Sequence, residues 1–251
     1  MRKSLTAGAA ALALVAASAA LADTEDTPGN WVTHVEHSAD ADMIGNPDAK
    51  VLVSEFVSYT CSHCAHFAKE GDGALQLAFI APGKVRLEVR PVIRNGVDIT
   101  LTMLAQCGGP DKFIGNHAML MYRQDEWLNK GRKATAEQRK RWASPDYAAG
   151  RRALAADLGL YDMMETRGIG RVAVDDCLKD DARANRLIAN SEVDRATFGV
   201  TGTPSFAING QLLEDVHDWA SLSQALQAQF PAPAESSPFE LDSTQSVDSP
   251  G

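Results

Sequence analysis

The sequence predicts an α/β protein in which a helical region interrupts a small sheet domain. Three observations support this prediction. An apolar run at 51–57 leads into a helical segment and then into an alternating strand at 85–92. A long stretch with helical character follows at 97–198. The chain then returns to two short apolar runs around an Asn-Gly turn within 205–213, which predicts a hairpin.

The N-terminus has the features of a signal peptide. Arg2 and Lys3 precede an alanine-rich apolar run that ends in the small-residue pattern Ala20-Leu21-Ala22. A membrane anchor is the alternative, but the run holds many small residues and no second apolar stretch of comparable length follows it. We therefore expect residues 1–22 to be removed on export, and the protein to work in the oxidising periplasm.

Composition excludes some classes of partner. The chain of 251 residues has a net charge of −9, and without the expected signal peptide 22 basic residues face 33 acidic ones, a net charge of −11. Nucleic acid is therefore excluded as an expected partner. A hydrophobic content of 45% is ample for a core. Residues 231–251 are rich in Pro and Ser with four acids and no base, which predicts a disordered tail.

The remaining elements follow from apolar spacing and from breaking residues. Residues 23–42 form an N-terminal segment in which Trp31-Val32-Thr33-His34-Val35 is expected as a first strand. A helix is expected from Ser62 to about Phe79, bent or interrupted at Gly71 and Gly73. Helices of the inserted region are expected near 98–107, 111–130, 135–142, 145–158 and 171–198. A final helix from His217 to Phe230 is expected to pack on the sheet through Trp219, Leu222, Leu226 and Phe230.

The chemical centre predicted by the sequence is Cys61-Ser62-His63-Cys64. The motif follows a strand and opens a helix, where unpaired N–H groups and the helix dipole favour a thiolate at Cys61. A Cys-x-x-Cys is a redox pair, half of a zinc site, or two structural cysteines. A zinc site usually needs a second close pair, and Cys107 and Cys177 lie 70 positions apart. We therefore expect a redox pair that needs neither a metal nor a cofactor.

Together with Thr203-Pro204 far downstream, this motif resembles the thioredoxin superfamily and, within it, the DsbA-like thiol:disulfide oxidoreductases. The resemblance covers about 43–230. It implies a thioredoxin fold in which a helical domain is inserted between an N-terminal β-α-β unit and a C-terminal hairpin-helix unit. Residues 43–96 and 199–230 would form the thioredoxin-fold domain, and 97–198 the inserted helical domain.

The resemblance also implies roles for neighbours of the cysteines. Glu55 matches a buried acid that would relay the proton that Cys64 must lose. His63 matches a histidine that helps to stabilise the thiolate of Cys61, the expected exposed and attacked sulfur. Ser62 stands where the best-known members have proline, and its hydroxyl can donate to the thiolate.

Further expectations concern residues outside the motif. A Thr203-Pro204 bond taken alone would be trans. The resemblance implies a cis bond that presents the Thr203 backbone to an extended substrate strand. His66 is expected to be half-buried and structural. Cys107 and Cys177 both lie in the helical region, and the oxidising compartment favours a structural disulfide between them over two free thiols.

The function expected from these features is the introduction of disulfide bonds into reduced exported proteins through a Cys61–Cys64 disulfide. The resemblance implies a membrane redox partner similar to DsbB, and we expect a monomer. Two alternatives stay open. One is a thiol:disulfide isomerase or reductase on the same scaffold. The other is a chaperone-like protein that binds peptides in the groove beside Thr203-Pro204 with its cysteines idle.

Overall fold

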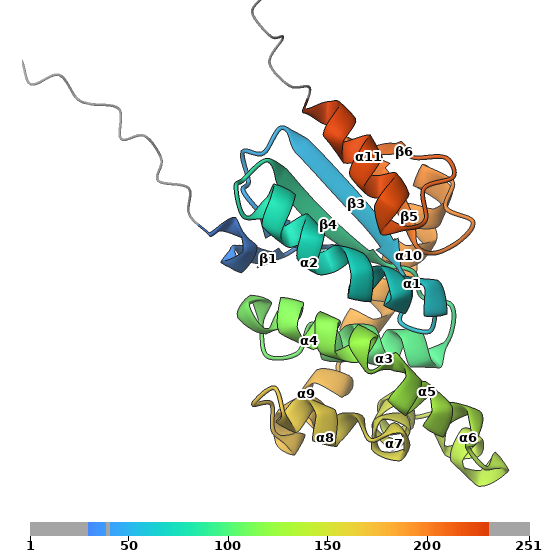
Figure 1. Cartoon of the computed structure of the whole chain (residues 1–251). Helices are drawn as coiled ribbons and strands as arrows, with labels where there is room; N and C mark the ends of the chain where they lie inside the picture. Colours follow the sequence, from blue (N-terminus) through green and yellow to red (C-terminus); the bar gives the residue numbers. More distant parts are fainter. Residues whose placement is uncertain (1–29, 39–40, 231–251) are drawn as a thin grey trace, which may run out of the picture.

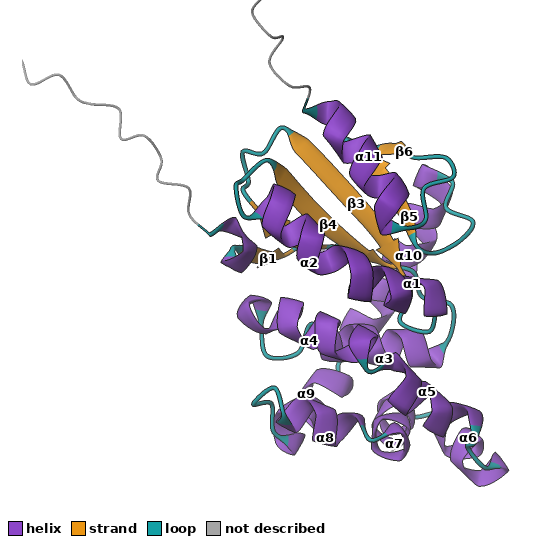
Figure 2. Ribbon diagram, viewed as in Figure 1, coloured by secondary structure: helices purple, strands orange, loops and turns teal. Residues whose placement is uncertain are grey.

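The computed structural model describes residues 30–38 and 41–230, and its centre is a six-stranded sheet (Figures 1 and 2). The strand order is β1-β2-β4-β3-β5-β6. Only β3 and β4 run parallel, and the other neighbours are antiparallel. The strands are β1 (Val35–His37), β2 (Asp42–Gly45), β3 (Val51–Val57), β4 (Val85–Pro91), β5 (Ser205–Ile208) and β6 (Gln211–Leu212). The expected signal peptide and acidic tail lie outside the described residues.

A long helical region connects β4 to β5. Between β4 and β5 lie α3 (Gly96–Ala105), α4 (Pro110–Tyr122), α5 (Gln124–Arg132), α6 (Ala136–Trp142), α7 (Tyr147–Leu158), α8 (Leu160–Glu165), α9 (Arg171–Leu178) and α10 (Asp181–Phe198). The last helix is α11 (Trp219–Gln229). In the described part of the chain, no helix is both long and apolar enough to cross a membrane.

The crossover from β3 to β4 is one helical segment in which α-helical and π-helical turns alternate. It consists of α1 (Ser62–Phe67), η2 (Ala68–Asp72), α2 (Gly73–Leu75) and η3 (Gln76–Ile80). The helix was expected to bend or break at Gly71, but it continues through this residue as a π-helical turn. A Cβ at Gly71 would lie 2.9 Å from the Phe67 ring and 3.2 Å from Trp219 Cβ, so glycine permits α11 to pack closely here.

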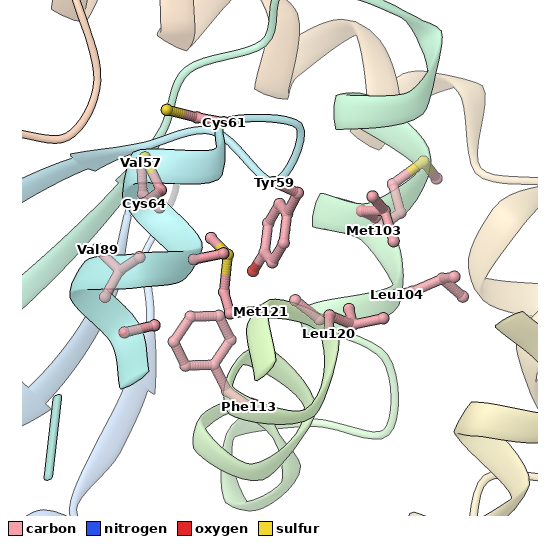
Figure 3. Packing of buried hydrophobic residues seen from close by; sticks show 14 of the residues in the cluster. Val57, Tyr59, Cys61, Cys64, Val89, Met103, Leu104, Phe113, Leu120 and Met121 are labelled. Carbon is pink, nitrogen blue, oxygen red and sulfur yellow. The ribbon is translucent and has the colours of Figure 1, made fainter. Parts of the chain in front are cut away.

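The two faces of the sheet bury different clusters. Side chains alternate along β3. Val53 and Val57 belong to the larger core, whereas Phe56 packs in a second cluster, with its ring centroid 4.9 Å from that of Phe198 on α10. The larger core continues without interruption into the helices between β4 and β5, where Met103, Leu104, Leu120 and Met121 gather (Figure 3). The sheet and the inserted helices therefore share one core.

Several predicted elements need correction. Trp31–Thr33 is a single 3₁₀ turn (η1) and not a strand, because the Thr33 and His34 amides bond back to Asn30 and Trp31. The Trp31 side chain lies close against Gly83, where a Cβ would come within 2.9 Å of its indole. The strand β1 begins only at Val35.

The helical region is also more divided than its periodicity predicts. The helix expected at 111–130 is broken at Arg123 into α4 and α5. The helix expected at 171–198 is broken before α10, whose N-cap is Asp180. The short helix α8 was not predicted. Of these breaks, the one before α10 has a polar N-cap, since the Asp180 side chain accepts from the Arg183 amide, whereas Arg123 makes no side-chain cap hydrogen bond.

The C-terminal unit has the predicted order of hairpin and helix. Asn209 and Gly210 both have positive φ (50° and 83°), as a two-residue hairpin turn requires. Asn209 also accepts a hydrogen bond from the Leu52 amide at 2.8 Å, which ties the turn to β3. The helix begins at Trp219, capped by Asp218, and buries Leu222 and Leu226.

Candidate active site

The two cysteines occupy the start of α1, directly after β3. Cys61 is the N-cap residue and Cys64 lies inside the helix; both are free thiols. Cys64 is fully buried beside Val57, whereas Cys61 lies at the edge of the cluster (Figure 3). Cys61 was expected to be exposed, but it keeps only 7% of its surface. In its thiol form, its sulfur donates to the Thr203 carbonyl at 3.1 Å, so the segment before β5 covers it.

The two thiols have opposite acidities. The pKa of Cys61 is lowered to about 4, chiefly by a hydrogen bond from Cys64 and further by the Thr203 hydroxyl and the backbone N–H groups of Cys64 and His63. The pKa of Cys64 is raised by burial and by its hydrogen bond with Cys61. The reduced pair therefore holds one thiolate and one thiol, with the charge on the more accessible sulfur.

Of the two residues between the cysteines, His63 lowers the pKa of Cys61, and it does so through its backbone amide. Ser62 and His63 are exposed. Among the described residues, neither the Ser62 hydroxyl nor the His63 ring makes a hydrogen bond to a sulfur, and it is the His63 amide that lowers the pKa of Cys61.

The interpretation of His66 as half-buried is wrong. Its side chain is 65% exposed and pairs with Glu70 one turn later at 3.2 Å.

The segment before β5 lies against the thiols. The Thr203–Pro204 peptide bond is cis, and Pro204 is buried. The Thr203 hydroxyl is buried beside Cys61, where it favours the thiolate form of that residue. His217 contacts the Pro204 carbonyl through Nδ1 at 2.7 Å, and sequence reasoning had not marked this histidine.

Asp98, at the start of α3, holds the turn that precedes Cys61. Its carboxylate is buried and accepts hydrogen bonds from the Ser58 hydroxyl (2.8 Å) and from the Thr60 amide (2.9 Å) and hydroxyl (3.1 Å). It also accepts from the Arg94 amide at 3.1 Å. An acid in a helical first turn is usually a capping residue, so the sequence carried no signal for this contact.

Gln124, the first residue of α5, reaches the same turn from another helix. Its amide Nε2 donates to the carbonyl oxygens of Tyr59 at 2.7 Å and Cys61 at 2.8 Å. The sequence placed Gln124 inside one long helix, where a glutamine is usually exposed. The break at Arg123 is what turns this side chain inward.

Two buried acids lie between β3 and the helical crossover that follows the cysteines. Glu55 on β3 and Asp72 on the crossover line a cavity of about 20 Å³ together with His117. Burial raises the pKa of Glu55 well above its usual range, with a further contribution from Asp72, and raises that of Asp72 to about 7. Burial lowers the pKa of His117 to about 4, so this ring stays neutral. Its Nδ1 contacts the Tyr59 hydroxyl at 2.9 Å.

The second cysteine pair forms a disulfide. Cys107 follows α3 and Cys177 lies in α9; their sulfurs are bonded at 2.03 Å with a Cα–Cα distance of 5.8 Å. The bond therefore joins the start of the helical region to its later part. Across the described ranges, no group of three or more His, Cys, Asp or Glu side chains is arranged to hold a metal ion.

The fold and the site together define a DsbA-like protein of the thioredoxin superfamily: a dithiol at a helix N-terminus after β3, a cis-proline before β5, and helices inserted between β4 and β5. Residues 38–228 match the family model described as thioredoxin, so the chain belongs to this family. The predicted thioredoxin fold with a helical insertion is confirmed.

Two solved structures illustrate the likeness. A protein-disulfide isomerase from Novosphingobium aromaticivorans is 40% identical, with a TM-score of 0.71 over 74% of this chain and 95% of that chain. The alpha-DsbA1 of Wolbachia pipientis is 17% identical and shares the fold, with a TM-score of 0.57 over 75% of this chain and 89% of that chain.

Curated relatives come from Rickettsia. The protein named "Putative protein-disulfide oxidoreductase RT0103" in Rickettsia typhi is 29% identical over 174 residues, 69% of this chain. The match covers 56% of that protein, and 58% of a relative in Rickettsia bellii. The chain thus spans little more than half the length of these relatives.

Proposed function

We propose that the protein is a periplasmic thiol:disulfide oxidoreductase that introduces disulfide bonds into exported proteins through a Cys61–Cys64 disulfide. The observation that carries this proposal is the opposite acidity of the two thiols. A stabilised Cys61 thiolate favours the reduced form of the pair, and a couple with a favoured reduced form is a strong oxidant. The family and the names of the relatives support the same chemistry.

The reaction begins with the oxidised pair. A substrate thiolate attacks Cys61, the more accessible sulfur, and forms a mixed disulfide while the Cys61–Cys64 bond breaks. Cys64 leaves with the electron pair and takes up a proton, as its raised pKa requires. A second substrate thiolate then attacks the substrate sulfur of the mixed disulfide and releases the Cys61 thiolate. Two electrons pass from substrate to protein, and a membrane oxidase similar to DsbB would remove them.

Isomerase or reductase activity is the second candidate. The solved structure that is 40% identical is that of a protein-disulfide isomerase. A Cys61 pKa of about 4 makes the reduced protein a ready nucleophile at neutral pH, which isomerisation also needs. An isomerase of the exported type is usually an oligomer, so a monomer on a sizing column would favour the oxidase.

The deciding experiment is the equilibrium redox potential of Cys61–Cys64 in glutathione buffers, with the Cys107–Cys177 disulfide intact. A potential well above roughly −200 mV supports the oxidase, and one near roughly −270 mV, the value typical of thioredoxin, overturns it.

A parallel assay compares oxidation of a reduced substrate protein with repair of a substrate protein that carries wrongly paired disulfides. Cys61→Ser should abolish both activities; retained biological activity would support the peptide-binding alternative. Cell fractionation of the full chain tests export.

A further inference from the structure

The turn that presents Cys61 is held from outside the thioredoxin unit. Ser58 to Cys61 connects β3 to α1, and its strongest side-chain contacts come from α3 and α5 of the inserted region. We propose that Gln124 and Asp98 are positioning residues for Cys61, through which the inserted helices set the redox properties of the pair. The inference rests on the redox role proposed above.

Gln124 fixes the backbone at the cysteine itself. Its side chain is buried, with 2% of the residue exposed, and both hydrogens of its amide group are used on the carbonyls of Tyr59 and Cys61. The Cys61 carbonyl also accepts from the Ala65 amide at 3.2 Å, the first hydrogen bond of α1. Gln124 therefore orients the same peptide group from which the helix starts.

Asp98 fixes the other end of the turn. The residue is 1% exposed, and three of its hydrogen bonds go to Ser58 and Thr60. Its own position is set by Asn95, the N-cap of α3, whose side chain accepts from the Asp98 amide at 3.0 Å. Arg94 Nε lies 3.7 Å from the carboxylate and balances its charge. The turn is thus clamped at both ends by side chains whose own places are fixed.

These contacts matter because the stability of the Cys61 thiolate depends on how its sulfur is oriented relative to the N–H groups of α1. The amides of His63 and Cys64 lower the pKa of Cys61 only while the sulfur faces them, since hydrogen bonds weaken steeply with misalignment. Loss of Gln124 would remove one hydrogen-bond donor each from the buried carbonyls of Tyr59 and Cys61. A shift of the turn would reduce the free-energy cost of these lost hydrogen bonds. The sulfur would then lose alignment, the thiolate would be less favoured, and the pair would become less oxidising.

The test uses the full chain with Gln124→Met, which keeps length and removes both donors. We expect the thiolate absorbance of Cys61 to titrate about one pH unit higher than in the wild type. The equilibrium constant with glutathione should change about tenfold towards the oxidised protein, which is about 30 mV. Asp98→Asn should move both quantities in the same direction by less, and it serves if Gln124→Met does not fold.

The matched control is Asn116→Leu. Asn116 is an equally buried amide of the same helical region, and it donates to the carbonyls of Leu104, Ala105 and Cys107, away from the turn. It should lose stability without moving the titration or the equilibrium constant. The inference would be overturned if the glutathione equilibrium constants of Gln124→Met and Asp98→Asn both stayed within twofold of the wild-type value. It would also be overturned if Asn116→Leu shifted that constant as much as Gln124→Met does. A low wild-type potential would refute only the oxidase function, because the comparison between variants stands without it.

Discussion

The Cys61 sulfur lies 3.1 Å from the carbonyl oxygen of Thr203, a residue 142 positions later in the chain. This contact joins the start of α1 to the segment before β5. The same sulfur is paired with Cys64 within the helix. The acidity of Cys61 depends on Cys64 as a local partner and on the Thr203 side chain as a distant one, because the hydroxyl next to this carbonyl favours the thiolate.

The first prediction separates Cys64 from His63 as the source of the low Cys61 pKa. Cys64→Ala removes the hydrogen bond that contributes most, so the Cys61 pKa should rise from about 4 by one unit or more. His63→Ala keeps the backbone amide and should change it by less. Thiolate absorbance against pH measures both. A His63→Ala shift as large as that of Cys64→Ala would show that the imidazole acts directly, as the family resemblance implied.

A second prediction concerns Glu55 as a proton relay for Cys64. Glu55 is buried, and burial together with the nearby Asp72 raises its pKa well above the usual range, which favours the protonated form that could exchange a proton in the site. Glu55→Gln should slow the step in which Cys64 attacks a mixed disulfide at Cys61 by tenfold or more, with little change in the redox potential. Stopped-flow release of a thiol bound to Cys61 follows this step. An unchanged rate would remove the relay role.

The buried acids also predict how stability depends on pH. Asp72 has a folded pKa of about 7, above its unfolded value near 4. Below about pH 4 the carboxyl is neutral in both the folded and the unfolded state, so it does not lower the free energy of unfolding. As the pH rises from about 4 through 7, the unfolded state ionises more readily than the folded state and stability is lost. Asp72→Asn should be more stable than the wild type at pH 8 by about 1–3 kcal/mol, and the difference should shrink towards pH 4.

Chemical denaturation at several pH values checks this difference. Asp48→Asn, at an exposed turn, is the matched control and should show no such trend. If Asp72→Asn were less stable than the wild type at pH 8, the carboxylate would gain more from His117, 3.9 Å away, than it loses by burial, and the predicted cost of the charged form would be wrong.

The last prediction separates the second disulfide from the redox site. Replacing Cys107 and Cys177 together by Ala opens a loop closed over 70 positions and should lower the free energy of unfolding by about 4 kcal/mol in the chain-entropy model. The Cys61–Cys64 potential should not change. Urea denaturation and glutathione equilibration measure the two quantities. A changed potential with unchanged stability would assign the pair a redox role instead.

Local sequence patterns determined much of this protein. The apolar run at 51–57 and the alternation at 85–92, joined by a helical segment, predicted the strands β3 and β4, and Asn209-Gly210 predicted the hairpin. A Cys-x-x-Cys directly after a strand predicted a thiol at a helix start, because the N–H groups that stabilise a thiolate belong to the next residues in the chain. Each of these features depends on neighbours within a few positions.

Tertiary structure decided which polar residues serve the site. Gln124 and Asp98 look like ordinary helix residues, and only packing of α3 and α5 against the turn buries them there. Asp72 likewise becomes a buried acid because the crossover places it in one cavity with Glu55 on β3 and with His117, whose Nε2 lies 3.9 Å from its carboxylate. His66, on the same helix as the cysteines, stays in solvent. Apolar periodicity shows which face of a helix is buried, but the partner of a buried polar group comes from distant parts of the chain.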